Sequence, residues 1–238
     1  GTPIALADQQ AFLDALVLSN ATIGANGNGQ VTYAVNLPQS AVDFVPAGET
    51  YSFTYTITLT DRVDPASGNA TTSDTVTLTF TVTGANDAPV AVDDAVGSAL
   101  EPATDEDTSF SFDASDLLAN DTDIDVGDTV NLTVIGLAAN DGVDPLTGTV
   151  LTVTSAEGAT VTFDTETGEI TYAPGPGFQD LAVGESRADS FAYVIADASG
   201  ARSIATVTLT VGGANDAPTI TSTVLSDGIV TTDLGGTN

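Results

Sequence analysis

The sequence has no cysteine, histidine, methionine, tryptophan or lysine, and these absences exclude several kinds of site. Without histidine and cysteine, the chain cannot form a Ser-His-Asp triad, a Cys-His pair or an ordinary zinc site. No disulfide can form, so stability has to come from the hydrophobic core and from any bound cation. No apolar run approaches the ~20 residues that are needed to cross a bilayer. Hard cations with oxygen ligands remain compatible with this composition.

Basic residues are almost as scarce. The three arginines Arg62, Arg187 and Arg202 stand against 33 acidic residues, and the formal net charge is −30. A charge of this size repels nucleic acid phosphates and anionic membranes, so we expect no nucleic acid partner and no membrane insertion. Two carboxylates 4 Å apart repel by roughly 1 kcal/mol in water and roughly 4 kcal/mol at an effective dielectric constant of 20. Clustered acids in this chain therefore need a cation from solution.

What the sequence does contain is a repeat. The motif Gly-Ala-Asn-Asp-Ala-Pro occupies residues 84–89 and recurs at residues 213–218, a spacing of 129 residues. This spacing is about one domain length, and each copy follows a strand-like run rich in threonine and valine. The repeat predicts a first module over residues 1–87, a second over residues 88–217, and the start of a third module or a tail over residues 218–238.

Alternation of residue type is the main secondary-structure signal. Residues 51–60 place large apolar side chains on one face and serine or threonine on the other, which is typical of a half-buried strand. Short runs of this kind, separated by Gly, Asn, Asp and Pro, predict an all-β chain of antiparallel β-sandwich modules. Residues 7–18 suit either a short amphipathic helix or a strand, and residues 115–119 suit one helical turn. Further strands are predicted at residues 75–83, 150–154, 160–163, 170–172, 191–195 and 205–212, with a hairpin turn at 165–168 and a loop at 174–177.

The densest chemical motif is Asn-Asp-Thr-Asp-Ile-Asp-Val-Gly-Asp at residues 120–128. Calcium takes six to eight oxygen ligands at about 2.3–2.6 Å, and a tight acidic loop can supply several of them. An EF-hand is excluded, because Leu132 stands where that loop needs its bidentate glutamate. The alternative is a solvated acidic loop. For Asn86 and Asp87, the alternative to metal binding is a turn that the side chains cap before a proline.

The two modules align without a gap around a second acidic position. Residues 47–50 match residues 183–186, and twelve residues after each glutamate comes an aspartate, Asp61 after Glu49 and Asp197 after Glu185. At ~3.3 Å per residue, the two acids of a pair lie up to ~40 Å apart along a strand. Each module is thus predicted to carry one acid near each end.

Taken together, these motifs resemble the bacterial cadherin-like and VCBS-type repeats of giant RTX adhesins, which type I systems secrete. The resemblance covers residues 85–218 as one full module, and residues 1–87 resemble a module without its opening strand. It implies immunoglobulin-like or cadherin-like sandwiches arranged end to end. The matching residues are the two junction motifs, Val92-Asp93-Asp94, Asp105 to Thr108, Leu117 to Asp128, and Asp189 to Asp197.

The resemblance also implies Ca²⁺ between successive modules. Carried over by position, the first junction would use Glu49, Asn86, Asp87, Asp121, Asp123 and Asp197, with Asp125 and Asp128 as additional ligands. The second junction would use Glu106, Glu185, Asn215 and Asp216. The chain departs from the cadherin pattern, because Gly48 and Gly184 precede the mid-domain glutamates where cadherins have Asp-Arg. It also lacks the acid two positions before the junction asparagine, so we expect fewer calcium ions per junction than in animal cadherins.

The function expected from this resemblance is structural. The chain would be an extender of a secreted adhesin at the bacterial cell surface, with neighbouring repeats of the same chain as partners and calcium making the junctions stiff. The alternative is a module that binds a glycan, ice or another copy of itself. An enzyme is not expected, because the only feasible type is a carboxylate-pair glycosidase and the acids gather at module ends instead of in a pocket.

Overall fold

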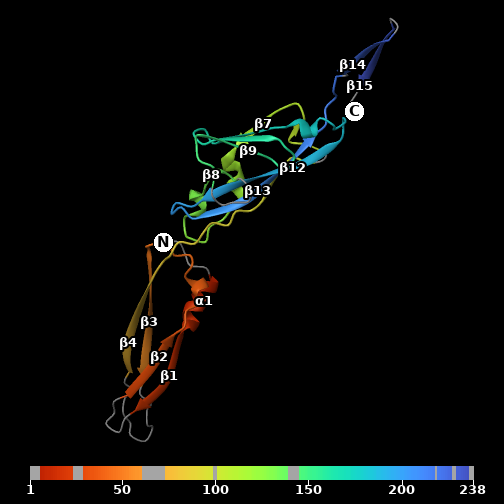
Figure 1. Ribbon diagram of the computed structural model, residues 1–238. Helices are drawn as coiled ribbons and strands as arrows, with labels where there is room; N and C mark the ends of the chain where they lie inside the picture. The colour runs from red at the N-terminus through yellow and green to blue at the C-terminus, as the bar shows by residue number, and fades with distance from the viewer. Residues whose placement is uncertain are drawn as a thin grey trace. The chain divides into compact units, whose positions relative to one another are not determined.

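The computed structural model describes residues 6–23, 29–60, 73–98, 101–138, 145–217, 219–226 and 229–235. The chain divides into two units, which are residues 1–87 with 124–127, and residues 88–123 with 128–238. Strands dominate both units, as the alternation predicts (Figure 1). No helix in the described ranges is long and apolar enough to cross a membrane. The division into three modules stays a prediction.

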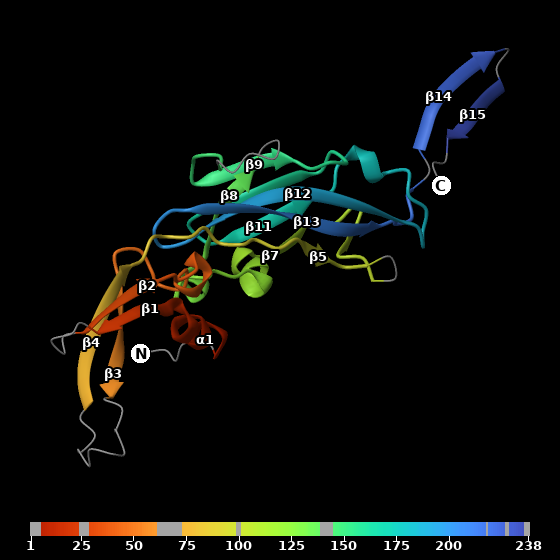
Figure 2. The same cartoon turned by 90° about the horizontal axis from the view of Figure 1, so that it is seen from below.

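The second unit contains two sheets that enclose one core (Figure 2). Inward side chains from both sheets are fully buried, among them Tyr172, Tyr193 and Val207. One sheet has four strands in the order β7 (Phe110–Asp113), β11 (Glu169–Ala173), β10 (Thr160–Asp164) and β9 (Val150–Thr154). The other has five, in the order β5 (Asp94–Val96), β13 (Arg202–Gly212), β12 (Ser186–Ala196) and β8 (Thr133–Ala138), with β6 (Thr104–Asp105) also paired to β13.

Two short strands depart from the expected antiparallel pairing. Strands β5 and β6 both run parallel to β13, with Asp94 opposite Val207 and Thr104 opposite Val211. Both belong to the opening segment of the unit, which therefore lies along its last long strand. Strands this short carry no readable alternation, because the pattern is recognisable only over about four to eight residues and these strands have three and two.

Shorter elements complete the second unit. The predicted helical turn at 115–119 is confirmed within a 3₁₀ helix, η2 (Ala114–Asn120). The predicted hairpin turn at 165–168 is confirmed between β10 and β11, and its Gly168 has a φ of 78°. The remaining elements are η3 (Thr129–Asn131), η4 (Pro176–Phe178), and a hairpin of β14 (Thr219–Ser226) and β15 (Ile229–Gly235).

The first unit begins with a helix, α1 (Leu6–Ala15), and the chain continues directly into β1 (Leu16–Ile23). Both interpretations of residues 7–18 are thus right in part. Aromatic rings fill the interior: Phe53 stacks on Phe80 with centroids 5.5 Å apart, and Phe12 of α1 packs on Phe53 at 4.9 Å. The other elements are β2 (Gly29–Val35), η1 (Gln39–Ala41), β3 (Thr50–Thr60) and β4 (Ser73–Thr83), with β1 paired to β2 and β3 paired to β4.

One exposed face of the β3–β4 ribbon consists of hydroxyl side chains opposite one another. We call this face the hydroxyl ladder; its five pairs are Thr50–Thr83, Ser52–Thr81, Thr54–Thr79, Thr56–Thr77 and Thr58–Thr75. Hydroxyl oxygens meet across the ribbon at 3.0 Å between Ser52 and Thr81 and at 3.2 Å between Thr54 and Thr79. The corresponding β12–β13 ribbon of the second unit pairs Ala188, Ser190 and Ala192 with threonines, so it carries no such ladder.

Candidate metal centres

Both units approach the repeated motif through the same backbone geometry. Gly84 donates its N–H to the Glu49 carbonyl at 2.9 Å, and Gly213 donates to the Glu185 carbonyl at 3.0 Å. A Cβ on Gly84 would lie 2.0 Å from the Val45 carbonyl oxygen, and one on Gly213 would lie 2.3 Å from that of Ala182. Glycine is therefore needed at the first position of the motif, and the two glutamates occupy equivalent positions beside it.

At the second copy of the motif, the centre is Glu106. Its side chain is only 2% exposed, and its Oε1 accepts a hydrogen bond from the Ala214 N–H at 2.9 Å. Its backbone N–H donates to the Gly212 carbonyl at 3.0 Å, which fixes Glu106 against the motif. Its Oε2 is buried and has no hydrogen-bond partner among the residues that the structure describes.

The neighbouring residues of the motif add a second oxygen of this kind. Asn215 donates its side-chain amide to the Asp216 carbonyl at 3.3 Å, and the Asp216 Oδ2 is buried, with no donor in the described part of the chain. Glu185 uses its Oε2 to accept from the Ala182 N–H at 3.0 Å. A buried acceptor without a donor costs about 1–3 kcal/mol, and more when it is charged. Both of these oxygens are carboxylate oxygens, the kind of ligand that a hard cation takes.

The acidic loop at residues 120–128 holds a second buried carboxylate. Asp121 is 3% exposed, and its Oδ1 accepts from the Val92 N–H at 2.8 Å. Its Oδ2 is buried and meets no hydrogen-bond donor within the described ranges. Burial raises the pKa of Asp121, and the charge of Asp94 adds to this effect, while the bond from Val92 opposes it.

Three other aspartates of this loop gather closely. Carboxylate oxygens of Asp123, Asp125 and Asp128 all lie within 4.8 Å of one another. Gly127, with a φ of 97°, turns the chain between the last two, and the Asp87 N–H donates to Asp125 Oδ2 at 2.9 Å. Asp128, expected only as an additional ligand, is thus part of the tightest carboxylate group, whereas Asp121 is not.

The remaining predicted ligands have local roles. Asp197 accepts from the Ala201 N–H at 2.9 Å in the turn after β12, and Glu185 and Asp197 flank the two ends of β12, as their spacing predicts. Asn86 donates its side-chain amide to the Asp87 carbonyl at 2.6 Å, and the Glu49 side chain is exposed. Asp61 lies outside the described residues. Within the described ranges, these ligands form no further close group of three.

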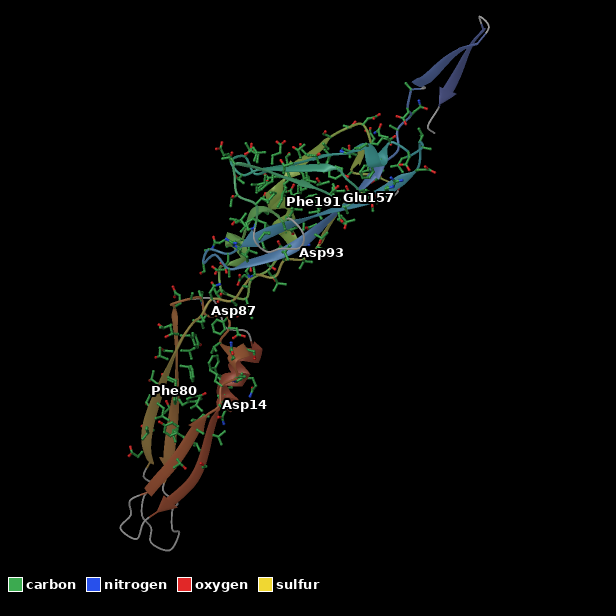
Figure 3. All side chains as sticks on the ribbon, in the orientation of Figure 1. Asp14, Phe80, Asp87, Asp93, Glu157 and Phe191 are labelled. Carbon is green, nitrogen blue, oxygen red and sulfur yellow. The ribbon has the colours of Figure 1, made fainter. Side chains whose placement is uncertain are left out.

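Residues just before β5 connect the acidic loop to the core. Asn120 donates its amide to the Val92 and Asp93 carbonyls and to Asp94 Oδ1, at 3.3, 3.3 and 3.1 Å. Asp94 Oδ2 accepts from the Tyr193 hydroxyl at 2.7 Å, and Asp93, labelled in Figure 3, accepts from the Thr206 N–H of β13 at 2.8 Å. Burial raises the pKa of Asp94 despite its bonds to Tyr193 and Asn120. No pattern in the sequence indicated this role of Asn120.

A further buried acid, Asp189, was not predicted as a site and has a structural role. It is 3% exposed, and its two oxygens accept from the Tyr172 hydroxyl at 2.6 Å, the Glu157 N–H at 2.8 Å and the Ser190 N–H at 2.7 Å, as well as from the Ser155 hydroxyl. Its position could have been found, because Asp189 shares the inward parity of Phe191 on β12.

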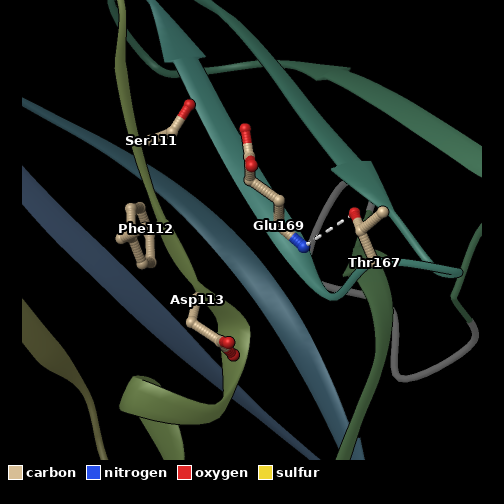
Figure 4. Close-up of a pocket in the computed structure, with 5 residues that line it drawn as sticks. All are labelled: Ser111, Phe112, Asp113, Thr167 and Glu169. Atoms are coloured by element: carbon tan, nitrogen blue, oxygen red, sulfur yellow. Dashed lines mark hydrogen bonds between the residues drawn. The ribbon is translucent and has the colours of Figure 1, made fainter.

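A shallow pocket lies beside the edge strand β7 (Figure 4). Its two carboxylates are engaged locally. Asp113 accepts from the Ser115 N–H at 2.8 Å, a bond that lowers the pKa of Asp113, and Glu169 Oε1 accepts from the Thr171 hydroxyl at 3.3 Å. The remaining lining residues are Ser111, Phe112 and Thr167.

Comparisons with known proteins agree with this architecture. The family described as Bacterial cadherin-like domain matches residues 86–213, more than half of the chain. Cadherin-like domains are extracellular, of a non-enzymatic adhesion type, and usually bind Ca²⁺.

Similar solved structures are extracellular cadherin domains. Protocadherin GammaB4 is 18% identical with a TM-score of 0.36, over 85% of this chain and 26% of that one. Protocadherin gammaB7 EC3-6, solved as a cis-dimer, is 14% identical with a TM-score of 0.35, over 89% and 44%. The chain thus spans less than half the length of these structures, and scores this low carry no argument on their own. No curated protein matches the sequence. By the family match, this chain belongs to the bacterial cadherin-like domains.

Proposed function

We propose that the chain is a structural extender of a secreted bacterial adhesin, in which Ca²⁺ binds at the ends of modules and makes their junctions stiff. The observation that carries the proposal is the pair of buried oxygens at the second motif, Glu106 Oε2 and Asp216 Oδ2, which lack donors in the described structure. Burial removes their water, and a chain of net charge −30 with three arginines has almost no side-chain cation to offer.

Calcium suits these residues better than other cations. Carboxylates and carbonyl oxygens are the ligands that Ca²⁺ prefers, and its flexible coordination tolerates the irregular geometry of a loop. Magnesium demands near-ideal octahedral geometry and dehydrates reluctantly. Glu106, Glu185 and Asp216 would hold the ion at the second motif, with the Asn215 carbonyl as a further ligand. Asp87, Asp121, Asp123, Asp125 and Asp128 would hold it at the first motif, with Glu49, Asn86 and Asp197 completing the set.

The bound ion would neutralise carboxylates that otherwise repel, and it would order the short segment after each motif. Extracellular calcium modules bind at about 10⁻⁴–10⁻³ M, so millimolar calcium outside the cell fills them and cytosolic calcium does not. This dependence would keep the chain unstructured before secretion and rigid afterwards. The RTX adhesin setting rests on the resemblance of the junction motifs, and the partners are then the neighbouring repeats of the same chain.

Titration calorimetry with calcium tests the proposal, followed by small-angle scattering in calcium and in EDTA. We expect heat of binding in the wild type, a loss of one class of sites in Glu106→Gln, and no change in the matched variant Glu101→Gln, whose side chain is exposed. In EDTA, the radius of gyration and the maximum dimension should change. A chain that binds no calcium at millimolar concentration refutes the proposal.

The hydroxyl ladder favours a second candidate function, the binding of a periodic and uncharged ligand. Its rungs repeat every ~6.7 Å along the strands and lie ~4.8 Å apart across them, a regular array suited to ice or to a neutral polysaccharide. An ice-partition assay and a glycan array test this function. The double variant Thr54→Lys/Thr79→Lys should lose binding, and the matched change Ser190→Lys/Thr208→Lys on the second unit should keep it. No binding by the wild type rules this function out.

A further inference from the structure

The opening segment of the second unit follows β13 along the whole length of that strand. At one end, the Ala91 N–H donates to the Ser203 hydroxyl at 3.2 Å and Asp93 accepts from the Thr206 N–H at 2.8 Å. At the other end, the Glu106 N–H donates to the Gly212 carbonyl and Glu106 Oε1 accepts from the Ala214 N–H. We call this run of contacts the parallel seam, made of residues 91–96 and 103–106 against residues 203–214.

The parallel seam continues across a short excursion of the chain. β5 pairs with β13 up to Val96, and pairing resumes where the Ala103 N–H donates to the Thr210 carbonyl at 2.8 Å, followed by β6. Gly97 and Ala103, on either side of this excursion, lie close together, because a Cβ on Gly97 would lie only 2.4 Å from the Ala103 nitrogen. A force applied along the segment therefore passes from β5 to β6.

A candidate metal ligand lies at each end of the parallel seam, Asp121 at the first and Glu106 at the second. At the first end, Val92 is held by Asp121 and by Asn120, which contacts three successive residues of the segment. At the second end, Glu106 is at once the last residue of the seam and the main candidate ligand. Each end of the seam is thus fixed by side-chain hydrogen bonds in addition to the backbone hydrogen bonds between the strands.

We propose that the parallel seam is the element of the second unit that resists mechanical tension on the chain. The chain enters the unit at Ala88, beside the Ser203 end of the seam, and leaves its two-sheet part at Ala217, beyond the Ala214 end. Tension between these residues pulls the two parallel segments past each other along their length. All bonds of the seam then resist together, because sliding has to break them at once and not one after another. The described part of β4 in the first unit pairs with β3 and with no parallel segment.

The test is single-molecule pulling of the full chain in two directions. The sequence has no cysteine, so two introduced cysteines are the sole attachment points. Ala88→Cys with Ala217→Cys loads the seam in shear. Asp107→Cys with Ala217→Cys loads both segments from the same end and opens the seam bond by bond. All three positions, Ala88, Asp107 and Ala217, are exposed. Ala217 belongs to both pairs, so the two pairs differ in one attachment point alone. We expect a several-fold higher unfolding force in the shear direction at the same loading rate.

Variants of the seam sharpen the test. Asn120→Ala removes three of the side-chain bonds at the Ser203 end, so it should lower the shear force and leave the same-end force unchanged. Ser98→Ala removes the bond from the Glu101 N–H inside the excursion, outside the seam, and should change neither force. Equal unfolding forces in the two directions overturn the inference, as does an Asn120→Ala variant that weakens both directions alike.

The contribution of calcium to the seam rests on the proposed function. The same pulling experiment tests the load path and the calcium proposal separately. If calcium binds at the seam ends, the shear force falls in EDTA. If the shear force exceeds the same-end force but does not change in EDTA, the load path stands and the calcium proposal fails. If EDTA lowers the forces but the two directions unfold at equal force in calcium, calcium binds and the load path fails.

Discussion

Replacing Glu106 by glutamine should change the stability of the second unit in opposite directions with and without calcium. The side chain is 2% exposed, and its Oε2 has no donor in the described structure. In EDTA, the variant removes a buried charge and keeps an oxygen for the Ala214 N–H. A buried acceptor without a partner costs about 1–3 kcal/mol, so we expect the free energy of unfolding in EDTA to rise by about 1 kcal/mol.

In calcium, the order of the two proteins should reverse. Free calcium at ten times its dissociation constant stabilises the wild type by about 1.4 kcal/mol per site, and the variant loses this gain. The stability of the variant relative to the wild type therefore changes from about +1 kcal/mol in EDTA to about −0.4 kcal/mol in calcium. This swing of about 1.4 kcal/mol corresponds to about 3–6 °C in melting temperature for a chain of this size.

Differential scanning calorimetry of both proteins in calcium and in EDTA measures the swing, with Glu101→Gln as the control. A variant that melts below the wild type by the same margin in both media would show that Glu106 is a structural acid and no metal ligand.

Three further predictions follow from the second unit. In EDTA, the free energy of unfolding of the second unit should fall as the pH rises above 3.8, the pKa of an aspartate in the unfolded chain. Burial raises the pKa of Asp94 and Asp121 in the folded unit, so the unfolded chain releases these protons first. Urea titrations across the acid range should show this fall in stability, and a smaller fall in Asp121→Asn. Gly213→Ala should destabilise the unit by about 1–3 kcal/mol, since its Cβ would meet the Ala182 carbonyl; a melting temperature equal to that of the wild type would contradict the clash. Ser155→Ala should cost about 1–3 kcal/mol by removing a donor to the buried Asp189; urea titration measures the loss, and an unchanged midpoint would show that the remaining three donors suffice.

The long strands could be predicted from the sequence because alternation reports burial directly. Residues 191–195 alternate in phase with the interior, and β12 contains them with Phe191 and Tyr193 buried. β5 and β6 were not found, because what fixes them is their pairing with β13 and not a pattern of their own. Chain order gives no information on a parallel partner more than a hundred residues away.

The candidate metal residues were predicted by type and only partly by grouping. The sequence showed four aspartates within residues 121–128 but not which of them lie together. The turn at Gly127 places Asp128 with Asp123 and Asp125. Asp121 is directed instead to the Val92 N–H, a contact between segments that spacing within one loop does not encode. The equivalence of Glu49 and Glu185 could be predicted from the alignment of the two modules. In the structure, both glutamates accept the same backbone hydrogen bond, from Gly84 and from Gly213 respectively.

That recurring bond has an evolutionary consequence. β4 and β13 each lead into the same glycine-closed corner, formed by main-chain atoms that do not depend on the surrounding side chains. Unequal crossing-over between two copies of the motif would therefore add or delete a whole unit and leave both of its ends intact. If the chain is an extender as proposed, such exchanges would change its length by one whole repeat at a time.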